Sequence, residues 1–382
     1  MLCLLVVTSL VTLSVFFNVS TVSAQTPVPN TAADRLMHVS LTLEAQEIGI
    51  AFSPFLEDSG AANQAFLEGI VGSRVRVGSL DAHRALRLGS LAPNLNVSGS
   101  TESENDNVPG AQEPKSTLWL SRNTQGWQLE IHSGEDQDVN DIHIVPLSYR
   151  ERALSFSTFS ASIHSTDDEM GRLMFRWGRH AWSADFRFEE LPTPPKRPRV
   201  SGRGTAREAD DDGTRIARRS MLNERNETRV VLPGGANVSV LFWKNLDVDE
   251  ADYSRVETIR DDAVIEMIHA PVLRFKSDVP LRFGGEDVPT GNLAAGFAGA
   301  YGIWLKKIAN GWRLVFNNEP DSWGTQYDQD FDAVEVAVDY MRGDGAFRPL
   351  GVTLVPTGSH QGRLMIHWGP HEWAADFVIP VP

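Results

Sequence analysis

One stretch of the sequence occurs twice and decides the fold. Residues 171–186 read GRLMFRWGRHAWSADF, and residues 362–377 read GRLMIHWGPHEWAADF, an offset of 191 residues (362 minus 171) without a gap. Self-similarity at a fixed offset is the sequence signature of an internal repeat. The sequence therefore predicts a chain built from two copies of one domain.

Each copy has the pattern of a β-hairpin. Turns at Gly178–Ala181 and Gly369–Glu372 would place the two tryptophans of each copy opposite each other, and a proline in the second turn suits a turn position. Alternation in a strand then gives each hairpin one apolar face. The predicted core residues are Leu173, Phe175, Trp177, Trp182, Ala184 and Phe186, and in the second copy Leu364, Ile366, Trp368, Trp373, Ala375, Phe377 and Ile379.

The other face of each hairpin is polar. Asp185 lies within diagonal reach of Arg172 and Arg176, so we expect ion pairs there. In the second copy, Asp376 is within diagonal reach of Arg363 and His367. The histidines His180 and His371 fall at the predicted turns.

Length and composition limit the class of protein. The 382 residues suit two domains of average size, and the formal charge of −15 argues against nucleic acid or an anionic membrane surface as a partner. The one cysteine, Cys3, lies in the N-terminal apolar segment. Without that segment the chain has no thiol, which excludes cysteine catalysis, iron–sulfur clusters and cysteine zinc sites.

The N-terminal segment predicts export. Residues 2–24 are apolar and end in Val22-Ser23-Ala24, which is typical of a secretory signal with its cleavage site. Its length also approaches a membrane span, so an uncleaved anchor is the alternative. We expect an exported protein, periplasmic or extracellular, that contacts a membrane only through this segment if it is uncleaved.

The rest of the chain predicts an all-β fold of two tandem β-sandwich-like domains. Short alternating segments separated by turn signals are typical of this class. An N-terminal β domain is expected over residues 34–188 and a C-terminal one over residues 228–382. Residues 189–227 are rich in charge, proline and glycine and predict a linker. Within the first domain, residues 81–88 suggest a short helix and residues 94–116 a long loop.

Further features recur in both copies. Trp119 and Trp127 are eight residues apart (127 minus 119), as are Trp304 and Trp312 (312 minus 304), and such repeated tryptophans are expected to pack in cores. The second copy alone carries residues 323–328, which read WGTQYD. Aromatic rings beside amides can stack on sugars and hydrogen-bond to them, although core packing is the alternative for each ring. The predicted ligand-binding residues are Trp323, Tyr327, Gln326 and Asn317.

Five stretches of the second copy resemble a known family. They lie at Val288–Gly291, Tyr301–Trp304, Gly311–Asn317, Trp323–Asp328 and Asp332–Val336. In this order they are similar to the bacterial domain-of-unknown-function family numbered twenty-nine eleven, over roughly Ser277–Phe377. The resemblance implies a secretory signal and a compact β domain, and no established activity. The family's Arg-x-Gly stretch corresponds to Arg282-Phe283-Gly284, which adds Arg282 to the binding candidates, and the N-terminal unit is interpreted as a divergent copy.

A hydrolase is the competing hypothesis. His371, Glu372 and Asp376, with Arg363, would form its acid/base group, and His367 and His371 are the candidate metal ligands. We predict no metal or cofactor, because a turn separates these histidines and the first copy has Arg176 in place of His367. No phosphate loop, nucleophile elbow or zinc-protease motif occurs.

The favoured function is therefore a non-enzymatic exported protein. It would bind a small ligand, such as a glycan, or act as a structural component of the envelope with a protein partner.

Overall fold

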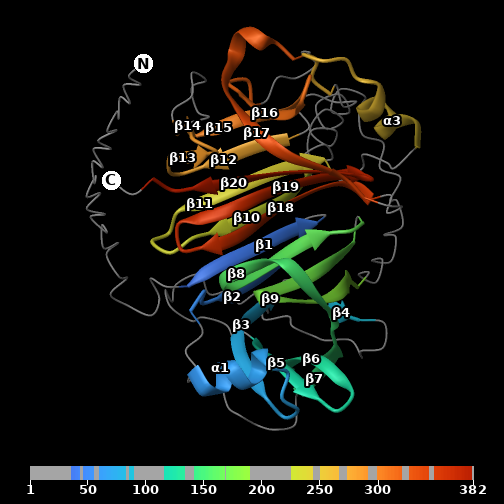
Figure 1. Ribbon diagram of the computed structural model, residues 1–382, viewed down its shortest axis with the longest axis vertical. Coiled ribbons are helices and arrows are strands. Elements are labelled where there is room, and N and C mark those ends of the chain that lie inside the picture. Colours follow the sequence, from blue (N-terminus) through green and yellow to red (C-terminus); the bar gives the residue numbers. More distant parts are fainter. Residues whose placement is uncertain are drawn as a thin grey trace, which may run out of the picture.

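The structure is a computed structural model of the chain (Figure 1). It describes residues 36–43, 46–55, 60–82, 86–89, 116–133, 142–167, 169–189, 225–243, 250–265, 273–290, 299–320, 327–343 and 348–380. The predicted signal segment and residues 190–224 of the predicted linker lie outside these ranges.

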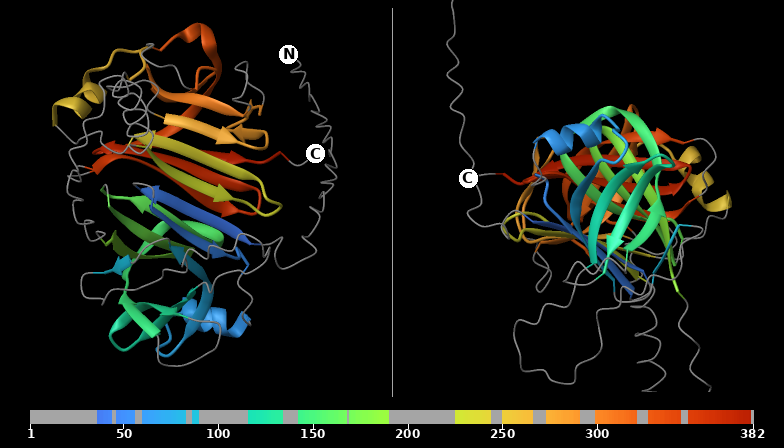
Figure 2. Two further views of the ribbon diagram at one scale, coloured as in Figure 1. Left: turned by 180° about the vertical axis from the view of Figure 1, so that it is seen from behind. Right: turned by 90° about the horizontal axis from the view of Figure 1, so that it is seen from below.

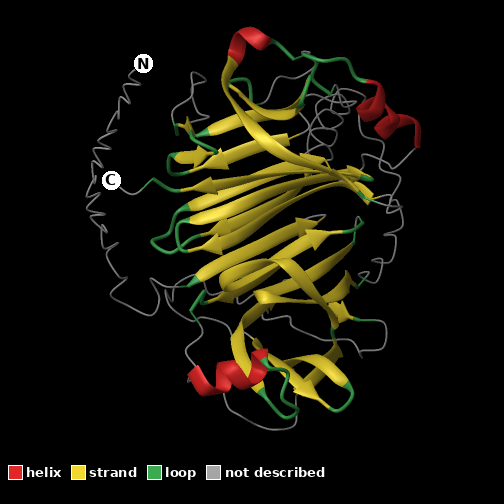
Figure 3. Ribbon diagram, viewed as in Figure 1, coloured by secondary structure: helices red, strands yellow, loops and turns green. Residues whose placement is uncertain are grey.

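Strands dominate both halves, which confirms the all-β prediction (Figure 3). The N-terminal half contains β1 (Met37–Leu43), β2 (Gln46–Phe52), α1 (Gly60–Leu67), β3 (Arg74–Ala82), β4 (Leu86–Leu88), β5 (Ser116–Asn123), β6 (Gly126–His132), β7 (Ile142–Pro146), β8 (Ser148–Ser165) and β9 (Met170–Phe188). Neither described helix is both long and apolar enough to cross a membrane.

The C-terminal half follows a similar order. It contains β10 (Arg225–Val231), β11 (Asn237–Trp243), α3 (Glu250–Thr258), β12 (Leu273–Ser277), β13 (Leu281–Phe283), β14 (Glu286–Val288), β15 (Ala300–Ile308), β16 (Gly311–Asn317), a 3-10 helix (Gln329–Phe331), β17 (Asp332–Arg342), β18 (Arg348–Gly358), β19 (Gln361–Gly369) and β20 (His371–Val378). The first of these strands begins three residues inside the predicted linker, at Arg225.

One layer of strands runs through both halves. Successive antiparallel pairs connect β7, β6, β5, β3, β2 and β1 to β10, β11, β12, β15, β16 and β17. The halves meet at the β1–β10 pair, where Val39 lies opposite Val230 and Leu41 opposite Thr228. From behind, the blue strands of the N-terminal half lie beside the yellow strands of the C-terminal half (Figure 2). The predicted domains are thus joined edge to edge.

In the C-terminal half, β17 connects this layer to a second one. Its residues 332–338 pair with β16, and its residues 339–342 pair with β20. Beyond β20 lie β19 and then β18. Leu364 of β19 and Val336 of β17 are among the buried apolar residues, and these belong to a core that includes side chains from both halves.

The repeated stretch of the N-terminal half lies within β9, which folds back on itself. The Phe188 N–H donates to the Glu169 carbonyl at 3.0 Å, and Arg172 Nε lies 2.5 Å from Asp185 Oδ1. Strand β8 pairs with both arms of β9, residues 148–151 with the second arm and residues 156–165 with the first. The expected hairpin and its Arg–Asp contact are therefore present.

The hairpin of the second copy is tighter than predicted. Trp368 pairs with His371, so the loop consists of Gly369 and Pro370, and Trp373 lies opposite Ile366 instead of Trp368. Gly369 has a φ of 56°, as the first position of this two-residue loop requires. The predicted register was wrong by two residues, and a shift of two keeps each side chain on its face. The predicted core face is buried in both copies, apart from the half-buried Trp177 and Ile379.

The described residues of the stretch 81–88, which are 81–82 and 86–88, are in strands and not in the expected helix. Asp81 and Ala82 are the last two residues of β3, and Leu86 to Leu88 form β4, which pairs with β9. Both leucines are fully buried while Arg87 points outward, so the period-two burial in the folded sheet overrides the local helical pattern. The described helix near this region is α1, which the sequence analysis did not predict.

A second contact between the halves runs along β8 and β18. The Ser160 hydroxyl donates to the Pro356 carbonyl at 2.6 Å, and Thr353 Oγ1 lies 3.1 Å from His164 Nδ1. A side chain at Gly351 of β18 would collide with the ring of His367 and approach the Ser165 hydroxyl to 2.9 Å. Glycine is thus required here because the His367 ring of the neighbouring strand in the same half lies against it, with Ser165 of the other half also close.

We expect Gly351→Ala to lower the free energy of unfolding by about 1–3 kcal/mol, the usual cost of forcing an extra methyl group into a packed site. Denaturant unfolding of the full chain measures the change. Gly343→Ala is the matched control, since the added carbon there meets only the Pro370 carbonyl, at 3.7 Å. Equal stability of the two variants would contradict the close packing around Gly351.

Candidate functional site

The predicted aromatic site is described only in part. Trp323 and Gln326 lie outside the described residues. Asn317 is buried, and its Nδ2 donates to the Asp328 carbonyl and to Asp332 Oδ1, both at 2.9 Å. The Tyr327 hydroxyl donates to the other carboxylate oxygen of Asp332. These polar groups therefore bind one another and fix the chain before β17.

The environment of Tyr327 agrees with this internal role. Burial, followed by the hydrogen bond to Asp332, raises the pKa of Tyr327 far above its ordinary value. Its ring packs on Trp304, with centroids 5.4 Å apart. Arg282 lies apart from this group on β13, where it forms an exposed ion pair with Asp287 of β14 at 2.6 Å.

The predicted acid/base group is divided between the two faces of the C-terminal hairpin. Arg363 lies opposite Asp376, and His367 opposite Glu372, on one face. His371 lies opposite Trp368 on the other face and is fully buried. The strand register thus separates His371 from both carboxylates and from His367. Among the described residues, no three His, Cys, Asp or Glu side chains gather as a metal site would require.

His371 belongs instead to an aromatic cluster that both halves contain. Its Nδ1 lies 2.8 Å from the Tyr340 hydroxyl, and the rings of Trp312 and Trp373 pack at 5.4 Å beside them. In the N-terminal half, the Tyr149 hydroxyl lies 2.8 Å from His180 Nδ1. The rings of Trp127 and Trp182 pack beside that pair, with centroids 5.3 Å apart. Sequence analysis singled out the histidines and tryptophans but missed both tyrosines.

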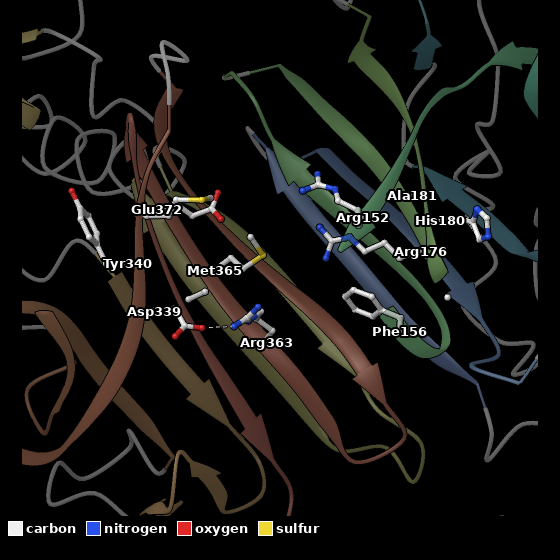
Figure 4. Close-up of a pocket in the computed structure, with 13 residues that line it drawn as sticks. Arg152, Phe156, Arg176, His180, Ala181, Asp339, Tyr340, Arg363, Met365 and Glu372 are labelled. Atoms are coloured by element: carbon white, nitrogen blue, oxygen red, sulfur yellow. Dashed lines mark hydrogen bonds and ion pairs between the residues drawn. The ribbon is translucent and has the colours of Figure 1, made fainter. Parts of the chain in front are cut away.

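A cavity of about 340 Å³ lies between the halves (Figure 4). Strands β8 and β9 form one wall, and β17, β19 and β20 form the other. The lining residues are Arg152, Phe156, Arg176, Gly178, His180 and Ala181 from the N-terminal half, and Asp339, Tyr340, Met341, Arg363, Met365, Glu372 and Ala374 from the C-terminal half. Apolar and charged side chains thus face one space.

A second cavity, of about 310 Å³, lies on the outward face of the N-terminal hairpin. Its lining includes Arg150, Arg172, Met174 and Ser183. Arg152 lines both cavities. The second cavity is the more polar of the two and provides control positions for experiments on the first.

The charges of the first cavity are unevenly distributed. Arg363 lies 2.6 Å from Asp339 and 3.0 Å from Asp376, so two carboxylates neutralise it. On the opposite wall, Arg176 contacts the Met174 sulfur at 3.9 Å, and its guanidinium lies 5.3 Å from the centre of the Phe156 ring. No carboxylate of the described residues forms an ion pair with Arg176 within 4.0 Å.

Burial lowers the pKa of Arg176 to about 10, and the positive charge of Arg152 contributes to this shift. The carboxylate of Glu372 acts in the opposite direction, and Arg363 adds a further lowering. The desolvation and repulsion of Arg176 therefore exceed the attraction that the protein supplies.

Sequence reasoning found the residues of this cavity only in fragments. It placed Arg176 and Arg363 on outward strand faces, as partners of Asp185 and Asp376, and the structure forms the Arg363–Asp376 contact. Arg152 and Phe156 carried no signal of their own. An arginine at the outward face of each copy was the available hint, but nothing local indicates that the two faces meet.

Comparison with known proteins supports part of the predicted resemblance. Residues 272–377 match the family described as Protein of unknown function (DUF2911). This is the family that the sequence motifs indicated, and the match begins five residues before the predicted start (277 minus 272). It does not extend to the N-terminal half, whose origin as a divergent copy stays a prediction. No curated protein and no solved structure matches the chain.

The buried His371 predicts a pH dependence of stability. Burial lowers its pKa below the ordinary 6.5, with the nearby Arg342 adding to this and Glu257 opposing it. The unfolded chain then binds the proton more readily, so the free energy of unfolding falls as the pH drops below about 6.5.

Chemical unfolding of the full chain at pH 7 and pH 5 measures this change. His371→Gln should lose less stability between the two pH values than the unchanged protein does. His180→Gln, at the half-buried corresponding position, is the control and should keep the full loss. An unchanged loss in His371→Gln would show that this histidine does not cause it.

Proposed function

We propose that the chain is an exported, non-enzymatic protein that binds a small molecule in the cavity between its halves. The cavity itself carries this proposal. Its volume of about 340 Å³ lies within the range of about 300–1,000 Å³ that is typical of small-molecule sites. Both halves contribute to its walls, so the complete site needs the whole chain.

The lining suits binding of a ligand with an apolar part. Phe156, Met365 and Ala374 offer apolar surface, while the neighbouring arginines and carboxylates offer oriented polar groups. A few polar groups within an apolar lining are the usual composition of ligand sites. Because these side chains come from strands, their positions are fixed before a ligand arrives.

Export rests on the N-terminal segment, and a common origin of the halves rests on the repeat. The Tyr149–His180 and Tyr340–His371 pairs, each 31 residues apart in sequence, support that origin. A glycan site at Trp323 stays a prediction. The hydrolase hypothesis lacks support, since His371 is buried away from Glu372.

A thermal-shift screen tests the proposal. The chain from Gln25 onward is heated with soluble sugars, glycan fragments and small organic acids. A compound that binds only the native state raises the melting temperature. At a concentration of 100 times its Kd, it adds about 2.7 kcal/mol to the free energy of unfolding. We expect at least one compound to do so, and Ala374→Trp to abolish its effect by filling the cavity.

Ser183→Trp is the matched control. It adds the same side chain at an outward strand position that lines the second cavity, and it should keep the shift. A shift that persists in Ala374→Trp would place the ligand elsewhere and refute the proposal.

A further inference from the structure

The wall that the N-terminal half contributes to the cavity carries two guanidinium groups. Arg152 and Arg176 both point toward the space in Figure 4, with Phe156 beside them. The Phe156 ring, 5.3 Å from the guanidinium of Arg176, restricts the side chain. A restrained guanidinium fork is suited to paired hydrogen bonds with an oxyanion.

The carboxylates at the cavity are unevenly shared among its arginines. Of the two carboxylates in the lining, Asp339 binds Arg363, and Asp376 binds Arg363 from outside the lining. The three arginines and three carboxylates balance in total, but two of the carboxylates bind Arg363, so Glu372 is the one carboxylate of the lining left opposite Arg152 and Arg176.

We infer that the ligand carries an oxyanion, such as a carboxylate, phosphate or sulfonate group, and that Arg176 binds it with Arg152 beside it. This inference rests on the proposed function, because it assigns the chemical class of the ligand in the same cavity. The anion would supply the opposite charge that the described residues do not place against Arg176. Met365 and Phe156 would contact the apolar part of the same molecule.

The inference explains why a partly buried cation persists at this position. Removing a charge from water costs free energy unless an opposite charge compensates it. The pKa of Arg176, lowered to about 10, reflects that cost in the ligand-free protein. A bound oxyanion would reverse it and should raise this pKa again.

Two fluorescent probes that differ by one charged group test the inference. 8-Anilinonaphthalene-1-sulfonate carries a sulfonate, and N-phenyl-1-naphthylamine has the same aromatic body without it. We expect the unchanged protein to bind the anionic probe more tightly. Arg176→Gln should reduce that preference about tenfold or more, which is the usual effect of losing a charge-assisted hydrogen bond.

Two further substitutions of arginine sharpen the comparison. Arg176→Lys keeps the charge without the planar fork and should retain part of the preference. Arg172→Gln removes the same charge from the same strand face, outside the first cavity, and should leave the preference unchanged. Melting temperatures of all variants show that each is folded.

The outcomes separate the two proposals. If Ala374→Trp lowers the affinity for both probes while Arg176→Gln leaves their affinity ratio unchanged, the cavity binds ligands without distinguishing their charge. The inference is then wrong. If Ala374→Trp lowers the affinity for neither probe, the cavity is not a binding site, and the proposed function fails together with the inference. Loss of the preference in Arg176→Gln alone among the glutamine variants supports both.

Discussion

Main-chain hydrogen bonding between β1 and β10 is the interaction on which the rest of the structure depends. An edge strand presents unpaired N–H and C=O groups, which would otherwise invite association with other chains. Here the edge of each half satisfies that of the other, with Val39 opposite Val230. The second contact, where the Ser160 hydroxyl donates to the Pro356 carbonyl, relies on side chains. The two halves thus share one core and one continuous layer.

The cavity is a product of that union. Neither hairpin forms it alone, because Arg176 and Phe156 belong to one half and Met365 and Ala374 to the other. Holding the halves together takes Arg176 partly out of water, and Arg152 of the same half adds a neighbouring positive charge, so the pKa of Arg176 is lowered. The backbone pairing thereby supplies the energy that keeps a guanidinium in a costly environment. A ligand of opposite charge would recover part of this cost on binding.

Local patterns were sufficient for the all-β fold and for the buried face of each hairpin, because alternation and burial have the same period. They were insufficient for the turn, where Gly369 at a positive φ allows a two-residue loop that the expected four-residue turn overlooked. Residues 81–88 were misread since only the pairing of β4 with β9 decides their conformation. The cavity could not be predicted, because its walls are far apart in sequence and are brought together by the β1–β10 pair and the β8–β18 contact. His371 was wrongly predicted to be a functional group. Its pairing opposite Trp368 places it on the buried face of the hairpin, which the residue type alone does not indicate.

Arg176 and His367 occupy corresponding places in the two halves, 191 residues apart (367 minus 176). Arg176 pairs with Ser160 of β8 and His367 with Gly351 of β18, and these partners are also 191 residues apart (351 minus 160). If two identical subunits met in this way, a two-fold axis would force the same residue onto both sides, and any arginine would appear twice. A single chain is free of that constraint. One side can hold a cation while the other packs a histidine against Gly351. The covalent link between the halves thus allows the two walls of the cavity to differ, and a ligand of the proposed kind would bind in one orientation only.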